Sequence, residues 1–272
     1  MAHHRTIDRV AHIMEFVASH PEGVTLSEIA GAVGAPVSSI HMLLEGLASV
    51  GYLDRTAARY VLGPAPYVLT LRAQQSPAQM VTHRDLEVLA EEDNLTVLLC
   101  VRVGDYVVSI DEAGFDPMLQ HMARARLRIP ALQSSLGRVF VAALSDREMH
   151  EYLRRHEQQE LVEAFLGELA AIRSSGVALD VVKGFVPRGG TGTEVAVLAA
   201  PVYDREGRAI ASVAIGQEPA YVSSHLETLT ELLLRHCRHW ATRRNVAESL
   251  YDRPHPASPQ DPTAIRRRRA AS

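Results

Sequence analysis

Seven side chains near the amino terminus have the chemistry needed to contact a nucleic acid. Hydroxyl and imidazole groups can hydrogen-bond to base edges and phosphate oxygens, and arginines pair with phosphates. The set comprises Thr25, Ser38, Ser39, His41, Met42, Arg55 and Arg59. Each side chain also has an ordinary interpretation as part of a solvated surface. Which of these two interpretations applies depends on the secondary-structure elements that carry the residues.

A second group of candidates surrounds a predicted helix start farther along the chain. Ser134 and Ser135 follow Pro130 and can cap that helix, and a helix N-terminus also binds anions. These positions therefore suit the carboxylate or carbonyl group of a small ligand. Asp180 is a further candidate, either as a ligand contact or as a carboxylate that caps a backbone turn.

The sequence contains none of the common catalytic motifs. GxSxG, HExxH and a Ser-His-Asp context are absent, and the 13 histidines are scattered. His236, Cys237 and His239 do not all share one helix face and lack a fourth ligand, so we expect packing there. Cys100 and Cys237 lie in apolar runs and are expected to be buried thiols. We therefore expect no enzymatic activity, no cofactor and no bound metal.

Local signals place the first candidates on a helix-turn-helix. Apolar spacing predicts a helix over residues 6–19, and Thr25 with Glu28 forms a capping box that begins a second helix. Gly34 ends the second helix. Residues 36–50 predict a third helix with an apolar stripe that packs inward, formed by Ile40, Leu43, Leu44 and Leu47. The face opposite this stripe therefore stays exposed.

A hairpin is predicted directly after the third helix. Residues 52–54 and 59–62 read as two short strands around a polar turn, and this turn carries Arg55 near one strand. A helix enters the major groove of DNA readily, and a hairpin beside it can reach phosphates. The order of these elements is that of a winged helix-turn-helix.

The rest of the chain predicts a domain of mixed helices and strands. Strands are expected over residues 95–103, 106–112, 118–122, 177–186, 193–203 and 209–215. Helices are expected over residues 83–93, 134–144, 146–156, 160–174 and 223–244.

A length of 272 residues favours two domains. We expect a DNA-binding domain over residues 1–63, a linker helix over 64–80, a second domain over 81–245 and a disordered Arg-rich tail over 246–272. No apolar run approaches 18 residues, and the amino terminus lacks the apolar core of a signal peptide. We therefore expect a cytoplasmic protein that does not engage a membrane.

The charge of the amino-terminal region limits how tightly it can hold DNA. The whole chain has a net charge of −4, and residues 1–80 carry five arginines against six carboxylates. Phosphate binding depends on basic side chains. Two alternatives follow: a DNA-binding regulator, or a ligand-binding or protein-interaction module whose winged helix does not bind DNA tightly.

The order of motifs in residues 6–63 resembles the amino-terminal domain of IclR-type transcriptional regulators. The matching runs are GVTLSEIA, SSIHMLL, GYL and YVLG, and weaker similarity continues through RIPALQSSLGRVFVAAL and AAPVYDREGRAIASVAIG. The resemblance implies an α/β (α+β) protein with a winged helix-turn-helix, a linker helix and a GAF-like effector-binding domain. It also implies a repressor that binds pseudo-palindromic double-stranded DNA as a homodimer or a dimer of dimers.

The resemblance further implies an effector pocket in the second domain. The positions that line the family's pocket map onto Ser135, Leu136, Asp180, Val195, Val197, Val213 and Ile215, with Ser134 beside them. Several of these are apolar here where better-known members carry polar residues. This departure has two interpretations: either the small effector has a largely apolar or aromatic body, or the pocket has lost its ligand.

Overall fold

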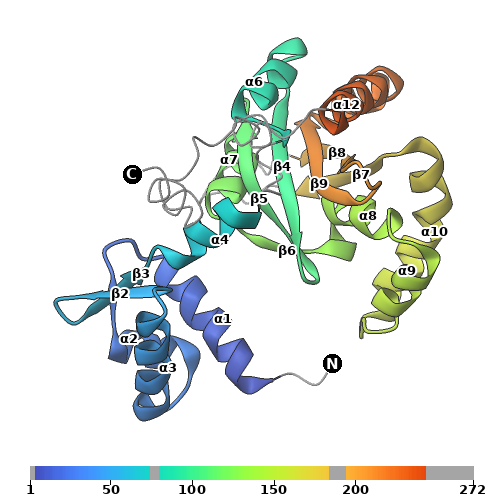
Figure 1. The fold of residues 1–272 in the computed structure, drawn as a ribbon. Coiled ribbons are helices and arrows are strands. Elements are labelled where there is room, and N and C mark those ends of the chain that lie inside the picture. Colours follow the sequence, from blue (N-terminus) through green and yellow to red (C-terminus); the bar gives the residue numbers. More distant parts are fainter. Residues whose placement is uncertain (1–3, 74–79, 184–193, 243–272) are drawn as a thin grey trace, which may run out of the picture. The chain divides into compact units, whose positions relative to one another are not determined.

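The computed structural model describes residues 4–73, 80–183 and 194–242, and the chain divides into two compact units (Figure 1). The first unit is Met1–Gln75 and the second is Ser76–Ser272. The helix after the hairpin therefore groups with the first unit. The Arg-rich tail expected over residues 246–272 lies outside the described residues.

The first unit has the predicted order of three helices and a hairpin. Its described elements are α1 (Arg5–Ala18), β1 (Val24–Thr25), α2 (Leu26–Val33), α3 (Val37–Ser49), β2 (Leu53–Thr56), β3 (Arg59–Leu62) and α4 (Ala65–Ala73). The strands form an antiparallel sheet in the order β1-β3-β2, so the hairpin gains a short third strand that the sequence analysis missed.

Local capping explains where α2 and α3 begin. The Thr25 backbone N–H donates to the Glu28 carboxylate at 2.7 Å, and the Glu28 backbone N–H donates to the Thr25 hydroxyl at 3.3 Å. The hydrogen bonds that the Thr25 backbone N–H and the Thr25 hydroxyl donate to the Glu28 carboxylate hold the pKa of Glu28 below its ordinary value. Gly34 ends α2 with φ 64°, a conformation that glycine adopts without strain. Pro36 stays extended, so α3 begins one residue later than predicted, at Val37.

The turn of the hairpin is strained. Ala57 and Ala58 have φ of 49° and 67° and connect β2 to β3 as a two-residue loop. Turns with two positive φ values favour Asn and Gly, because a side chain with a Cβ is crowded in this conformation. We expect Ala58→Gly to stabilise the hairpin by about 1 kcal/mol and to slow amide exchange in β2 and β3 about fivefold, measured by hydrogen–deuterium exchange.

The matched control for Ala58→Gly is Ala11→Gly, because Ala11 is exposed in the middle of α1 with ordinary helical geometry. There the same change should destabilise the helix by about 1 kcal/mol. Equal or faster exchange in the Ala58→Gly hairpin would contradict the assignment of strain to this turn.

The second unit is built on one antiparallel sheet. Its described strands are β4 (Thr96–Val103), β5 (Tyr106–Ala113), β6 (Arg128–Pro130), β7 (Ala178–Lys183), β8 (Glu194–Tyr203) and β9 (Ala209–Gln217), in the order β6-β5-β4-β9-β8-β7. The helices are α6 (His83–Glu92), α7 (Pro117–Arg124), α8 (Ser135–Ala142), α9 (Asp146–Leu153), α10 (Gln159–Ser175), α11 (Pro219–Ser224) and α12 (Leu226–Ala241), with a 3-10 turn, η1 (Ala131–Gln133), before α8. No described helix is both long enough and apolar enough to cross a membrane.

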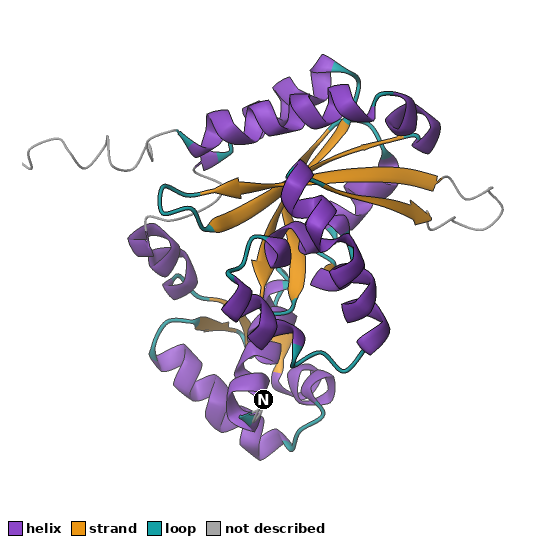
Figure 2. Cartoon of the chain, turned by 90° about the vertical axis from the view of Figure 1, so that its right-hand side faces the viewer, coloured by secondary structure: helices purple, strands orange, loops and turns teal. Residues whose placement is uncertain are grey.

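Helices cover both faces of this sheet, and each face has its own apolar core (Figure 2). Helices α7, α8, α9 and α10 pack on one face, where Val197 and Ala214 point. Helices α6, α11 and α12 pack on the other, where Leu198 and Val213 point. Successive residues of a strand point to opposite faces of the sheet, so successive residues of β8 and β9 are buried in the two different cores. The predicted fold class is confirmed.

Two predicted elements are corrected. Residues 118–122 were expected as a strand but lie in α7, because the Asp116 carboxylate accepts from the backbone N–H groups of Met118 and Leu119 at 3.0 and 2.9 Å. Pro117 occupies the first turn, where a missing N–H costs nothing. The single helix predicted over residues 223–244 is instead divided at His225 into α11 and α12.

Candidate functional site

The outward face of α3 presents several of the predicted DNA contacts. Ser38 and His41 are exposed, and Met42 is 73% exposed. Ser39 is half-buried, so its hydroxyl is less accessible than the sequence analysis expected. The opposite face packs into the first unit's core through Ile40 and Leu44. The stripe of apolar residues therefore orients the helix as a recognition helix requires.

A carboxylate lies on this same face. The Glu45 carboxylate is 3.6 Å from the Arg55 guanidinium of β2 and 3.8 Å from the His41 imidazole. Arg55 also lies 5.6 Å from the centre of the Tyr60 ring. The arginine predicted to reach phosphates therefore has an acidic partner within its own subunit.

Two other candidates make contacts within the first unit. Arg59 donates from Nη1 to the Gly23 carbonyl oxygen at 2.7 Å, which ties the guanidinium to the turn before β1. The Thr25 hydroxyl donates to the Glu28 carboxylate at 2.9 Å as part of the capping box. Both side chains stabilise the fold locally. Thr25 and Ser39 are half-buried, and the exposed members of the predicted set are Ser38, His41, Met42, Arg55 and Arg59.

The second unit contains a cavity of about 350 Å³ between its sheet and the helices α7 and α8. Its walls are mainly apolar and come from the sheet face that carries Leu98, Cys100 and Val197, and from Leu119 and Met122 of α7. This volume lies within the range of small-molecule sites in proteins, which are typically apolar with a few polar groups. Burial raises the pKa of the Cys100 thiol to about 12, so it stays protonated near neutral pH.

The polar end of the cavity is the beginning of α8. The Ser134 hydroxyl accepts a hydrogen bond from the Gly137 backbone N–H at 3.2 Å, and the Ser135 hydroxyl donates to the Val197 carbonyl at 3.0 Å. The Asp180 carboxylate of β7 accepts from the Ser135 backbone N–H and from the Arg138 guanidinium. The helix start that was predicted to hold a ligand's carboxylate is therefore already capped by an internal one.

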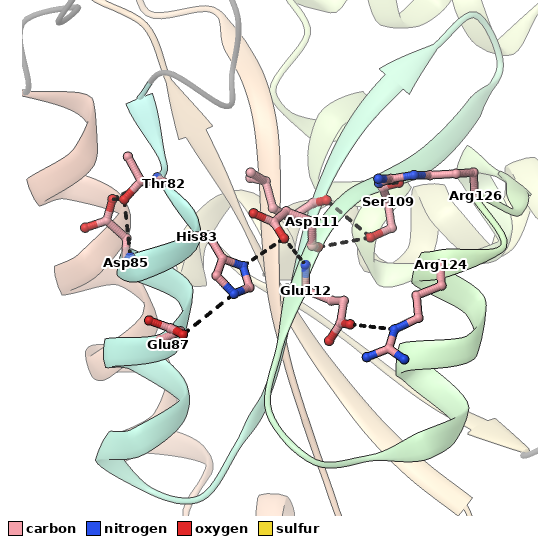
Figure 3. Close-up of polar contacts among 10 residues, drawn as sticks. Thr82, His83, Asp85, Glu87, Ser109, Asp111, Glu112, Arg124 and Arg126 are labelled. Atoms are coloured by element: carbon pink, nitrogen blue, oxygen red, sulfur yellow. Dashed lines mark hydrogen bonds and ion pairs between the residues drawn. The ribbon is translucent and has the colours of Figure 1, made fainter. Parts of the chain in front are cut away.

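A β-bulge links the cavity wall to α6. Opposite Leu99 and Cys100 of β4, strand β5 pairs through Asp111 and Ser109, so Ile110 is an extra residue. Ser109 lines the cavity, while the Asp111 carboxylate contacts His83 Nδ1 of α6 at 3.0 Å (Figure 3). The Ser109 carbonyl accepts from Arg126 at 2.8 Å. One strand therefore contributes both to the cavity and to the attachment of α6.

Comparison with known families decides what these two units are. The model of the IclR helix-turn-helix domain matches residues 6–57, and the model of the bacterial transcriptional regulator IclR C-terminal domain matches residues 73–242. The chain belongs to the IclR family. It is a DNA-binding regulator of transcription and not an enzyme, as the motif order of the sequence predicted.

Individual members of the IclR family agree with this assignment. The HTH-type transcriptional regulator TtgV of Pseudomonas putida is 30% identical over 186 residues, which cover 65% of this chain and 71% of that protein. The DNA-binding transcriptional repressor YiaJ of Escherichia coli is 26% identical over 218 residues, covering 75% and 74%. An IclR homologue from Microbacterium hydrocarbonoxydans, solved with 4-hydroxybenzoate, has a TM-score of 0.63 at 20% identity and covers 87% of this chain and 97% of its own.

In this IclR-family chain, the residues predicted to line the effector pocket lie in three different places. Ser134, Ser135, Leu136, Asp180 and Val197 all line the cavity. Val195 faces the same side of the sheet but lines a separate open hollow beside Gly216 and Asp116.

Val213 and Ile215 point to the opposite face and pack in the core under α12, so neither contacts the cavity. The reason is pairing: Val213 lies opposite Ala200 and Ile215 opposite Leu198, both of which point away from α8. In strands buried on both faces, apolar sequence does not reveal which side faces a site.

The sequence analysis missed the contribution of α7 to the cavity. Leu119, Met122 and Ala123 line the wall at spacings of three and four residues, which place them on one face of a helix. That spacing is a helical signal that the interpretation of residues 118–122 as a strand concealed. Ser109 and Gln133 also line the cavity, and no local pattern marks either of them.

Proposed function

We propose that this IclR-family regulator represses transcription by binding a pseudo-palindromic DNA site, and that a small effector in the cavity controls its affinity for that site. The observation that carries the proposal is the cavity of about 350 Å³ in a chain whose other unit presents an exposed α3 face. Relatives named as repressors, such as YiaJ, support the sign of regulation. The protein would act beside the bacterial chromosome, in the cytoplasm.

The lining of the cavity favours an apolar or aromatic effector. Leu98, Val107, Leu119 and Ile129 all contribute to its walls. Burying apolar surface against such walls is the main source of affinity for a small ligand. The Microbacterium homologue was solved with 4-hydroxybenzoate, and the aromatic ring of that ligand supports an aromatic body for the effector here.

Helix α4 supports self-association as a homodimer or a dimer of dimers. Four of its apolar side chains are between 38% and 67% exposed: Tyr67, Val68, Leu69 and Leu71. Apolar residues concentrated on one exposed helix suit an interface with a second copy of the chain. A dimer is expected in sedimentation at micromolar concentration, and a monomer across that range would contradict this part of the proposal.

The DNA-binding function is tested on α3. We expect Ser38→Ala and His41→Ala together to weaken binding of the dimer to the protein's own operator about 1,000-fold, because two base contacts are lost in each subunit and each costs about 1 kcal/mol. The operator comes from sequencing genomic fragments captured by the protein, and affinity is measured by fluorescence anisotropy. Binding to a scrambled sequence should change less than twofold, since phosphate contacts remain.

The Ser38/His41 variant has a matched control in Ser175→Ala of α10, because Ser175 is exposed and belongs to the other unit. Unchanged operator affinity in the α3 variant would contradict the choice of α3 as the recognition helix.

A protein-interaction role without tight DNA binding is the second candidate. It is favoured by the one excess negative charge in residues 1–80 and by the Glu45 carboxylate beside Arg55. A salt-dependent gel shift of the DNA upstream of the protein's own gene separates the two functions. A shift supports the regulator that binds its operator, and its absence at micromolar protein supports the interaction module.

A further inference from the structure

One end of the cavity has groups that usually attract anions, but an internal carboxylate occupies them. The Ser135 backbone N–H and the Arg138 guanidinium both donate to Asp180. The side chains of Arg138 and Asp180 are only 12% and 17% exposed, so solvent screens this pair weakly. Arg138 is also held in place by the Leu179 carbonyl oxygen at 3.1 Å. The positive end of α8 and the guanidinium charge are therefore already compensated.

We propose that the cavity selects uncharged ligands whose polar group donates a hydrogen bond, such as phenols and alcohols, and that Asp180 excludes carboxylates. This inference rests on the effector-binding function proposed above and specifies its ligand class. A ligand carboxylate at this end would lose its hydration without gaining these donors, because Asp180 already accepts from the Ser135 N–H and the Arg138 guanidinium and would lie beside it. A hydroxyl group would instead donate to Asp180, whose oxygens can each accept more than one hydrogen bond.

Lys183 does not reverse this preference. Among the described residues that line the cavity it is the only cationic one, but its side chain is 86% exposed. Its ammonium group lies 3.6 Å from the Glu194 carboxylate. An exposed and paired ammonium adds little attraction for an anion at the α8 end. The charge at the inner, polar end is therefore set by Asp180 and Arg138, together with the half-exposed Glu168 carboxylate 3.4 Å from Arg138 Nε.

The test compares two probes with the same apolar body, 4-ethylphenol and 4-ethylbenzoate, by isothermal titration of the full chain near neutral pH. We expect the wild-type protein to bind the phenol at least about tenfold more tightly, because the benzoate meets the Asp180 charge. Asp180→Asn keeps the shape of the side chain but removes its buried charge, so that Arg138 retains the half-exposed Glu168 carboxylate, 3.4 Å from its Nε, as an acidic partner. We expect it to shift the ratio of the two affinities toward the benzoate by about tenfold or more.

Lys183→Gln is the matched control, since it removes the exposed ammonium and should leave the ratio within about twofold. Equal binding of both probes by the wild-type protein, or tighter binding of the benzoate, overturns the proposal. So does an Asp180→Asn protein with an unchanged ratio, or a lack of binding of either probe to either protein. If Asp180→Asn does not fold, the wild-type ratio and the Lys183→Gln protein decide the question.

The same proteins separate this inference from the function on which it rests. A phenol that binds selectively but leaves operator affinity unchanged would contradict effector control and retain the charge selection. Equal binding of phenol and benzoate, with a change in operator affinity for both, would retain effector control and contradict the charge selection. The two failures therefore have different signatures.

Discussion

Gly137→Ala is expected to destabilise the second unit by about 3 kcal/mol. A Cβ at this position would overlap the carbonyl oxygen, Cα and carbonyl carbon of Ala131, because α8 and η1 cross closely there. Backbone atoms cannot rotate away as a side chain can, so α8 or η1 must move. Urea unfolding followed by fluorescence measures the effect, since Trp240 is the chain's single tryptophan and is buried in this unit.

Gly167→Ala provides the comparison for Gly137→Ala. Gly167 is exposed in α10, and an added Cβ there meets nothing within 4 Å. Alanine should stabilise the helix at that position by about 0.5–1 kcal/mol. If both variants unfold at the same urea concentration, the close crossing of α8 and η1 is not a constraint on the fold.

Glu45→Gln is expected to raise DNA affinity about tenfold for a dimer at moderate salt, for all sequences alike. The change removes one negative charge per subunit from the outward face of α3 and frees the Arg55 guanidinium 3.6 Å away. Both effects strengthen attraction to phosphates, so the salt dependence should also become steeper by about one charge per subunit. Anisotropy titrations of operator and scrambled DNA at several salt concentrations measure both quantities.

Glu163→Gln separates the local effect of Glu45→Gln from the change in net charge, because Glu163 is an exposed acid of α10 in the other unit. It should alter DNA affinity less than about twofold, since it changes the net charge by the same amount without removing a carboxylate from α3. In an Arg55→Ala background, Glu45→Gln should gain less, as expected for two coupled groups. An equal gain from Glu45→Gln and Glu163→Gln would show that α3 does not face DNA.

The first unit could be predicted closely because its signals are local. The capping box of Thr25 and Glu28, the positive φ of Gly34 and the apolar stripe of α3 each depend on residues within one or two turns. The contact of Arg59 with the Gly23 carbonyl could not be predicted, because it joins segments brought together by the sheet. Local patterns predicted α3 and its exposed face, whereas the partners of the neighbouring charges required the folded chain.

The cavity could be predicted only in part, for two physical reasons. Strands β8 and β9 are apolar on both faces, so the sequence did not assign Val213 and Ile215 to the core under α12. The contacts of Asp180 with Ser135 and Arg138 span more than 40 residues, and no spacing rule relates such distant positions. The helical spacing of Leu119, Met122 and Ala123 was present in the sequence and could have identified α7.

The extra residue in β5 has a consequence for comparing this chain with its relatives. Up to Ser109 the odd-numbered side chains of the strand face the cavity, and from Asp111 onward they face α6, because Ile110 inverts the alternation. A one-residue deletion at Ile110 would restore the regular alternation and still leave Ser109 on the cavity face and Asp111 toward α6, because these two residues already pair with the adjacent Cys100 and Leu99. An alignment gap at Ile110 therefore keeps each aligned side chain on its own face, whereas an alignment without the gap would exchange the two faces from this point onward. Relatives with and without that residue are expected to turn the same aligned side chains toward the cavity.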